Sequence, residues 1–264
     1  MIDRKVLVRG GGDLSSAIIH KLHRCGFHVL VLETEQPLAI RRTVAFSEAV
    51  QAGVSRVEEV EAQLVTTAQE MKTCWKEKRV PVMVDPEATI LKREVFDVVV
   101  DAIMAKKSLG THRNMAPNTI AIGPGFEAGV DVDIVVETNR GHNLGRLIFE
   151  GSAQADTGSP GSILGYTTER VLRAPKEGIL TAYKRIGDLV KSGDVIAEVK
   201  GKPVKTSIDG VLRGLIRDNT WVTEGLKIAD VDPRGEVEYC HTISEKGRTI
   251  AGGVLEAILM MGRH

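Results

Sequence analysis

A short apolar run that breaks into three glycines and then into a helical pattern constrains the fold of this chain more than any other feature. Residues 6–8 have the character of a buried strand, and the glycines at 10–12 follow directly after one arginine. Residues 15–25 show the apolar spacing of a helix, and residues 28–32 have the composition of a second strand. This order of elements predicts a Rossmann-like parallel sheet.

The glycine turn matches a dinucleotide-binding fingerprint with one departure. Gly10-x-Gly12-x-x-Ser15 has serine in the last glycine position, and Glu33 ends the second strand 21 positions after Gly12. Glycine permits positive φ and close backbone approach, so that the N–H groups opening the helix can surround an anion. An acid at Glu33 is expected to bind a ribose hydroxyl. Two interpretations stay open, a bound nucleotide or a tight turn without one.

Further strands are expected to bring more loops to the same edge of the sheet. Residues 80–85, 95–101 and 119–122 are apolar runs typical of buried strands, and residues 58–78 have helical apolar spacing. Because the carboxyl ends of parallel strands meet at one edge, the loops behind them line a common crevice. We expect that crevice to bind an anionic ligand through Gly10, Gly12, Asp13, Glu33, Asp101, Lys106, Gly123, Gly125 and Arg140.

Three residues are weak candidates for catalysis, and each has a second interpretation. Asp101 ends a strand with Lys106 close behind it, which suits acid–base work but also fits a helix cap beside a solvated lysine. His142 lies in a loop rich in glycine and functional groups, where it acts either as a general base or as a partner of a backbone carbonyl. The sequence leaves open whether any reaction is catalysed.

Charge and cysteine content exclude several classes of function. The chain has 35 basic and 35 acidic residues among 264, so no net charge attracts nucleic acid or an anionic membrane. Cys25, Cys74 and Cys240 are isolated, which favours reduced thiols over a disulfide framework. Cys240 and His241 alone are too few for a zinc site, so no metal is predicted. Without a spanning segment or a signal peptide, we expect a cytoplasmic protein.

An internal repeat with an offset of 32 residues occupies residues 170–232. The paired positions are Gly178 and Gly210, Val190 and Val222, Gly193 and Gly225, and Ala197 and Ala229. This predicts a small β-module of two related halves. The stretches 174–178, 190–195 and 208–211 resemble a biotinyl/lipoyl-type barrel-sandwich hybrid. The resemblance places the carrier lysine near Lys200, but the flanking residues lack a biotin or lipoyl motif, so no covalent cofactor is expected.

The tail forms the last predicted element. Residues 244–261 have helical apolar spacing, and the glycines at 252 and 253 imply that another part of the chain, such as a helix, approaches this backbone closely. We expect the helix to return to the first domain. The predicted domains are a Rossmann-like domain at 1–168, an inserted barrel-sandwich hybrid module at 169–233 and the returning C-terminal helix at 234–264.

Six motifs in order resemble the YqeB family, a group of proteins associated with selenium-dependent molybdenum hydroxylases. They lie at 10–14, 101–106, 123–126, 140–146, 157–161 and 252–257. The first domain is also similar to the Rossmann part of XdhC-type proteins, which help load molybdenum cofactor. The resemblance implies an accessory or maturation factor that acts on a hydroxylase apoenzyme or other maturation factors.

We expect a nucleotide-like ligand: the resemblance implies a molybdopterin-type cofactor, and the glycine fingerprint indicates NAD. A homodimer is one option for the assembly. The alternative function is an NAD-dependent oxidoreductase, which the fingerprint and Glu33 favour. No established reaction comes with the resemblance.

Overall fold

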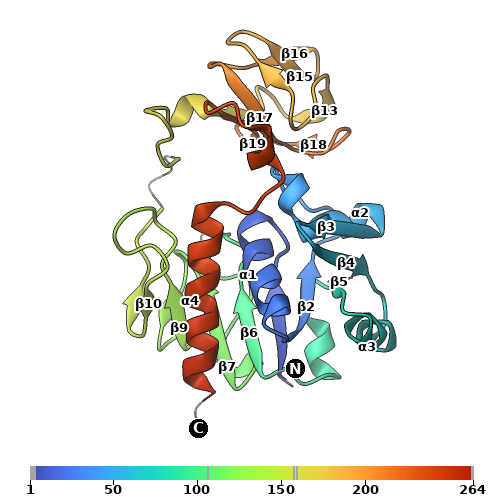
Figure 1. Cartoon of the computed structure of the whole chain (residues 1–264), viewed down its shortest axis with the longest axis vertical. Helices are drawn as coiled ribbons and strands as arrows, with labels where there is room; N and C mark the ends of the chain where they lie inside the picture. Colours follow the sequence, from blue (N-terminus) through green and yellow to red (C-terminus); the bar gives the residue numbers. More distant parts are fainter. Residues whose placement is uncertain (1–3, 106, 157, 159, 263–264) are drawn as a thin grey trace. The chain divides into compact units, whose positions relative to one another are not determined.

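The computed structural model describes residues 4–105, 107–156, 158 and 160–262, which form two structural units (Figure 1). Unit 1 comprises Met1–Pro37, Ala45–Thr157 and Ile243–His264. Unit 2 comprises Leu38–Val44 and Gly158–Thr242. Each unit is therefore assembled from segments that are far apart in the sequence.

A nine-stranded, mostly parallel sheet forms the centre of unit 1 in the described residues. In spatial order its strands are β10 (Leu147–Ile148), β9 (Ile134–Val136), β7 (Asn118–Ile122), β6 (Val98–Asp101), β1 (Lys5–Arg9), β2 (His28–Glu33), β5 (Val80–Val84), β4 (Val60–Leu64) and β3 (Val54–Val57). The edge strands β10 and β3 are antiparallel to their neighbours, and the other adjacent pairs are parallel. The predicted α/β architecture with a large parallel sheet is confirmed at this level.

The strand order changes direction at β1, which has β2 on one side and β6 on the other. Doubly wound sheets bind ligands where the strand order changes direction, beyond the carboxyl ends of the strands. The glycine turn at residues 10–12 directly follows β1 and therefore lies at this change of direction.

Two helices lie together on unit 1. Helix α1 (Asp13–Arg24) follows the glycine turn, and α4 (Glu245–Met261) packs alongside it (Figure 1). A Cβ atom at Gly247 would lie 2.9 Å from the Ala17 Cβ, so this glycine allows the two helices to approach closely. The C-terminal helix therefore packs against the N-terminal helix, as the sequence predicts for its return to the first domain.

The helix predicted over residues 58–78 is wrong in its first half. Residues 54–64 form the β3–β4 hairpin, and α3 (Ala68–Lys76) begins only after Thr67. Thr67 caps α3 and its partner Glu70 completes a capping box, which fixes the start of the helix. The β-branched run that ends at Thr67 favours extended backbone over a continuous helix.

A hydrophobic cluster joins α3 to the sheet. Met71, Cys74 and Trp75 pack against alternate residues of the central strands, including Leu7 and Leu30. The Trp75 indole also donates a hydrogen bond to the Val29 carbonyl at 2.8 Å.

The remaining elements of the described chain outside the two sheets of unit 2 are short. They are α2 (Ala49–Ala52), β8 (Glu127–Ala128), β11 (Gly151–Ser152), η1 (Arg42–Val44), η2 (Phe46–Glu48), η3 (Thr89–Lys92), η4 (Arg113–Met115), η5 (Thr168–Arg170) and η6 (Val237–Cys240).

Two four-stranded antiparallel sheets form unit 2, and they repeat each other. The first contains β16 (Lys202–Lys205), β15 (Val195–Val199), β13 (Gly178–Ala182) and β18 (Trp221–Val222). The second contains β12 (Val171–Arg173), β19 (Lys227–Asp232), β17 (Gly210–Leu215) and β14 (Leu189–Val190). Strands that occupy equivalent places in the two sheets lie four strands apart along the chain: β16 and β12, β15 and β19, β13 and β17, and β18 and β14.

The repeated glycines confirm this internal symmetry. Gly178 pairs with Val222, and its counterpart Gly210 pairs with Val190, so each half of the module supplies a strand to the other half. Both glycines have large positive φ values, +148° and +158°, and a side chain at either would meet neighbouring atoms. The repeat read in the sequence is thus a repeat of strand pairing.

Candidate functional site

Two of the three turn glycines are required by the fold itself. Gly10 has a φ of +96°, and a Cβ there would lie 3.0 Å from the Ala102 carbonyl oxygen. A Cβ at Gly11 would lie 2.9 Å from the Ser47 backbone nitrogen, which donates a hydrogen bond to the Gly11 carbonyl. Close contacts with their own protein therefore explain both residues without a ligand.

Gly12 has no such structural reason to be glycine. It is the N-cap of α1 with φ −68° and ψ −173°, a conformation that any residue adopts. A Cβ built at Gly12 would meet no atom within 4 Å, and no side chain caps the helix at this position. The first turn of α1 thus begins beneath open space, where its N–H groups and the helix dipole favour an anion.

Glu33 lies beside this turn at the carboxyl end of β2. One of its carboxylate oxygens accepts a hydrogen bond from the Gly11 N–H at 2.6 Å, and the other accepts from the Thr34 N–H at 2.9 Å. Burial raises the pKa of Glu33, although the two backbone hydrogen bonds oppose the change. The acid expected from the fingerprint is therefore positioned by the glycine turn itself.

Asp101 makes contacts that favour a structural role. Its carboxylate accepts hydrogen bonds from the Ile103 N–H at 3.1 Å and the Thr111 hydroxyl at 2.5 Å, and an Arg9 guanidinium nitrogen lies 3.9 Å away. Burial raises the pKa of Asp101, whereas Thr111 and Arg9 act to lower it. The Asp101 carboxylate anchors the start of the loop after β6 on Arg9, the residue just before the glycine turn. Lys106, predicted beside Asp101, lies outside the described residues.

The remaining strands end on the same edge. Strand pairing sets Arg9 level with Asp101 and with Leu32, and Ile122 level with Val136. The residues that follow these strand ends include Gly10, Glu33 and Gly123, which the register therefore brings to one edge of the sheet. A Cβ at Gly123 would collide with the Thr138 hydroxyl at 2.7 Å, so packing accounts for this glycine as well. Gly125, in the same turn, has a φ of +105°.

Arg140 belongs to the loop between β9 and β10, which packs against α4. Its guanidinium lies 3.5 Å from a carboxylate oxygen of Glu245, and both side chains are exposed. His142, in the same loop, is exposed. The loop turns back through a hydrogen bond from the Gly145 N–H to the Glu137 carbonyl at 2.9 Å.

Lys246 is a candidate that the sequence reasoning missed. Burial lowers the pKa of Lys246, the charge of Arg140 lowers it further, and the carboxylates of Asp13, Glu137 and Asp156 oppose the change. Lys246 therefore lies within electrostatic range of two predicted site residues, Asp13 and Arg140. A cation in the first turn of a helix opposes the helix dipole, and that unfavourable placement is the signal the sequence offered.

The two buried cysteines do not offer an activated thiol. Burial raises the pKa of the Cys74 thiol to about 11 and also raises that of Cys240. Cys25 is exposed at the end of α1. Because the thiolate is the nucleophile, the two buried cysteines are poorly suited to persulfide or selenide chemistry.

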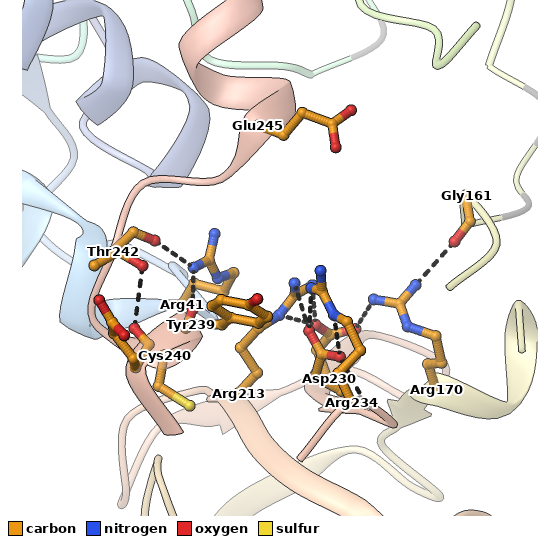
Figure 2. Close-up of polar contacts among 12 residues, drawn as sticks. Arg41, Gly161, Arg170, Arg213, Asp230, Arg234, Tyr239, Cys240, Thr242 and Glu245 are labelled. Carbon is orange, nitrogen blue, oxygen red and sulfur yellow. Dashed lines mark hydrogen bonds and ion pairs between the residues drawn. The ribbon is translucent and has the colours of Figure 1, made fainter. Parts of the chain in front are cut away.

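Unit 2 holds a cluster of arginines around two buried aspartates (Figure 2). Asp230 accepts from Arg170 at 2.9 Å and from Arg213 at 2.6 Å, while Asp232 accepts from Arg213 at 3.0 Å and from Arg234 at 2.6 Å. Burial acts to raise the pKa of Asp232, but the hydrogen bonds and charges of the arginines outweigh it, so the pKa is lowered. Arginine–carboxylate pairs of this kind hold strands β17 and β19 and the residues around them together.

Lys200, at the position of a carrier lysine, lies against its own module. Its ammonium is 5.6 Å from the centre of the Trp221 ring and 3.9 Å from a Glu177 carboxylate oxygen. Its aliphatic stem covers Gly178, because a Cβ there would lie 2.8 Å from the Lys200 Cγ.

Among the described residues, no helix combines the length and apolar character needed to cross a membrane.

Comparisons with known proteins give a curated sequence relative and several distantly similar solved structures. No protein-family description matches the chain. Solved structures with distant similarity include an aspartoacylase family protein from Mesorhizobium loti, 14% identical with a TM-score of 0.27, which aligns over 87% of this chain and 85% of that one. A succinylglutamate desuccinylase/aspartoacylase from Rhodobacter sphaeroides is 14% identical with a TM-score of 0.26 and the same coverage.

The sequence relative is much more similar. The uncharacterized protein YqeB of Escherichia coli (strain K12) is 49% identical over 256 residues, which make up 97% of this chain and 47% of YqeB. This chain spans about half the length of that relative. The chain is therefore a homologue of YqeB across nearly all of its own sequence.

Proposed function

We propose that this chain is an accessory factor for the maturation of a selenium-dependent molybdenum hydroxylase. In this proposal unit 1 is a Rossmann-like domain that binds a phosphate-bearing, nucleotide-like ligand at the carboxyl edge of its sheet. Unit 2 is a barrel-sandwich hybrid module without a carrier function. The motif resemblance to the YqeB family implies the hydroxylase context, the homology to YqeB supports that resemblance, and the geometry of unit 1 supports the ligand site.

The observation that carries the ligand site is the environment of Gly12. Its backbone conformation tolerates any residue, and a side chain there would enter open space. Serine, aspartate or asparagine would cap the helix better than glycine, so a glycine that the backbone conformation does not require suggests close approach by something outside the fold. A phosphate over the first turn of α1 fits this position, because the N–H groups there have no intrahelical partners.

Positive charge for such an anion comes from two side chains. Arg140 belongs to the loop after β9, and Lys246 belongs to the first turn of α4. Contact with an anion would favour the charged form of Lys246, which burial and Arg140 now disfavour. The environments of Cys74 and Cys240 disfavour transfer of sulfur or selenium by these two thiols, and the proposed role is to hold the cofactor rather than to modify it.

An NAD-dependent oxidoreductase is the second candidate, and Glu33 is the observation that favours it. The carboxylate lies at the end of β2, where a ribose-binding acid is expected, and the glycine turn fixes its orientation. If NAD binds, Glu33 should favour the ribose 2′-hydroxyl over a 2′-phosphate, so NADP should bind more weakly than NAD.

Calorimetry on the full chain distinguishes these functions. We would titrate NAD, NADP, ATP, CTP and molybdopterin nucleotides separately and follow NADH absorbance with candidate substrates. The accessory role predicts saturable binding of a molybdopterin nucleotide and no substrate-dependent formation of NADH. Tighter binding of NAD, together with NADH formation, would contradict it and support the oxidoreductase.

A further inference from the structure

A second group of polar side chains meets in unit 1 where α1 packs against the β3–β4 hairpin. Glu58 and Glu59 are the two residues of the hairpin turn, between the paired residues Val57 and Val60. The His20 Nε2 atom on α1 lies 3.6 Å from a Glu58 oxygen and 3.2 Å from a Glu59 oxygen. The three possible ligand atoms all lie within 4.8 Å of one another.

The Nε2 atom of this histidine lies close to two carboxylates without an aligned hydrogen bond. The His20 side chain is 4% exposed, and its Nε2 atom has no partner with hydrogen-bond geometry. A neutral imidazole nitrogen offers either one hydrogen or one lone pair, whereas two carboxylate oxygens converge on it. Buried polar atoms normally have partners, so this arrangement requires an explanation.

Other side chains hold the carboxylates in place. One oxygen of Glu58 accepts hydrogen bonds from Arg248 at 2.6 Å and from the Ile243 N–H at 2.9 Å, and one oxygen of Glu59 lies 3.2 Å from the Arg24 Nε atom. The opposite oxygen of each glutamate is the one nearer to His20. Hydrogen bonds from outer residues orient metal ligands in the same manner.

We propose that His20, Glu58 and Glu59 bind one divalent transition-metal cation, with water in the remaining position. Ligand atoms about 2.0–2.2 Å from a shared zinc ion lie roughly 3–3.6 Å apart, which matches the two distances from Nε2. An imidazole nitrogen with two carboxylates suits zinc or manganese, whereas calcium and magnesium prefer ligand sets made only of oxygen.

The ion would connect two elements of unit 1 directly, because His20 comes from α1 and the glutamates come from the β3–β4 turn. Helix α4 is connected through Arg248, which donates a hydrogen bond to Glu58. An ion that binds only the folded chain raises its stability by mass action. The role is structural and is independent of the ligand site at the sheet edge. No local motif marks this cluster, because Glu58 and Glu59 lie 38 and 39 positions after His20.

The test uses the full chain, stripped of metal by a chelator and then titrated with Zn²⁺ in a calorimeter. We expect one saturable site and a higher melting temperature with Zn²⁺. Glu59→Gln should weaken Zn²⁺ binding at least tenfold. This side chain is 53% exposed, so the variant is expected to fold.

Glu61→Gln is the matched control. It makes the same change on the same hairpin, but Glu61 lies beside Arg79 rather than His20, so Zn²⁺ affinity should stay at the wild-type value. Circular dichroism of each variant without metal checks the fold. Absence of saturable Zn²⁺ binding in the wild type would overturn the proposal. Equal affinities for Glu59→Gln and Glu61→Gln would overturn it as well, because any bound zinc would then lie at other residues.

Discussion

Lys246 is the residue whose charge most affects the proposed anion site. Replacing it with glutamine removes an ammonium that burial already disfavours, so the folded chain should not lose stability. A charge-assisted hydrogen bond contributes about 1.5–3 kcal/mol, and the ligand should therefore bind at least about tenfold more weakly. Calorimetry with the best nucleotide of the panel measures the change.

The same residue predicts how binding depends on pH. Lys246 has a lowered pKa in the folded chain, so it loses its proton at a pH below the 10.5 typical of an exposed lysine. Ligand affinity should fall as pH rises through that lowered pKa. Lys21→Gln on neighbouring α1 is the control, because its ammonium bonds to the Arg248 carbonyl and is exposed. Equal losses for both variants would remove Lys246 from the site.

Individual residues differ in how far the sequence could place them. The fingerprint correctly put Glu33 beside the glycine turn, because strand length and helix length fix that separation. The motif could not separate Gly12 from Gly10 and Gly11, since only three-dimensional neighbours show which glycines the fold requires. Asp101 is a candidate for acid–base catalysis from the sequence. In the structure its carboxylate accepts hydrogen bonds from Thr111 and the Ile103 N–H and lies near Arg9.

At the level of elements, α4 offers an internal comparison between two adjacent glycines. A Cβ at Gly252 would meet only the Lys21 ammonium nitrogen, at 3.7 Å, whereas a Cβ at Gly253 would lie 2.4 Å from the Gly145 carbonyl oxygen. Gly252→Ala should stabilise the chain by about 0.5–1 kcal/mol, because alanine is the better helix former. Gly253→Ala should destabilise it, because the loop after β9 must move.

Urea unfolding of both variants measures this difference. Equal changes in unfolding free energy would show that the loop does not pack on α4 as the structure has it. The close approach that the sequence predicted at this pair comes from a loop backbone rather than from a helix. Helix α1 instead approaches α4 at Gly247. Composition can indicate that a glycine needs space, but it does not identify the neighbour.

Other elements show where local patterns succeed. The β-module repeat was readable because each copy must present glycines at equivalent positions of strand pairing, as Gly178 and Gly210 do. The hairpin at 54–64 was missed because its apolar residues also fit a helical spacing. The Thr67–Glu70 capping box was the local signal that the helix begins later.

Across the whole molecule, the parallel sheet could be inferred from the order of its segments, because right-handed crossovers leave few arrangements for alternating strands and helices. The composition of each unit was harder to foresee. Leu38–Val44 belongs to unit 2 although it follows β2 in the sequence. Within that unit the Leu215 N–H donates to the Ile40 carbonyl, a long-range pairing that local sequence does not encode.

The account as a whole depends on an anionic ligand over the first turn of α1. The most direct test is calorimetry of the nucleotide panel with wild-type chain and with Gly12→Val, alongside circular dichroism and urea unfolding of both. The open space at Gly12 predicts an unchanged fold, and the valine side chain should then block the phosphate and reduce affinity at least a hundredfold. Retained affinity in a folded Gly12→Val chain would contradict the account and place the ligand elsewhere.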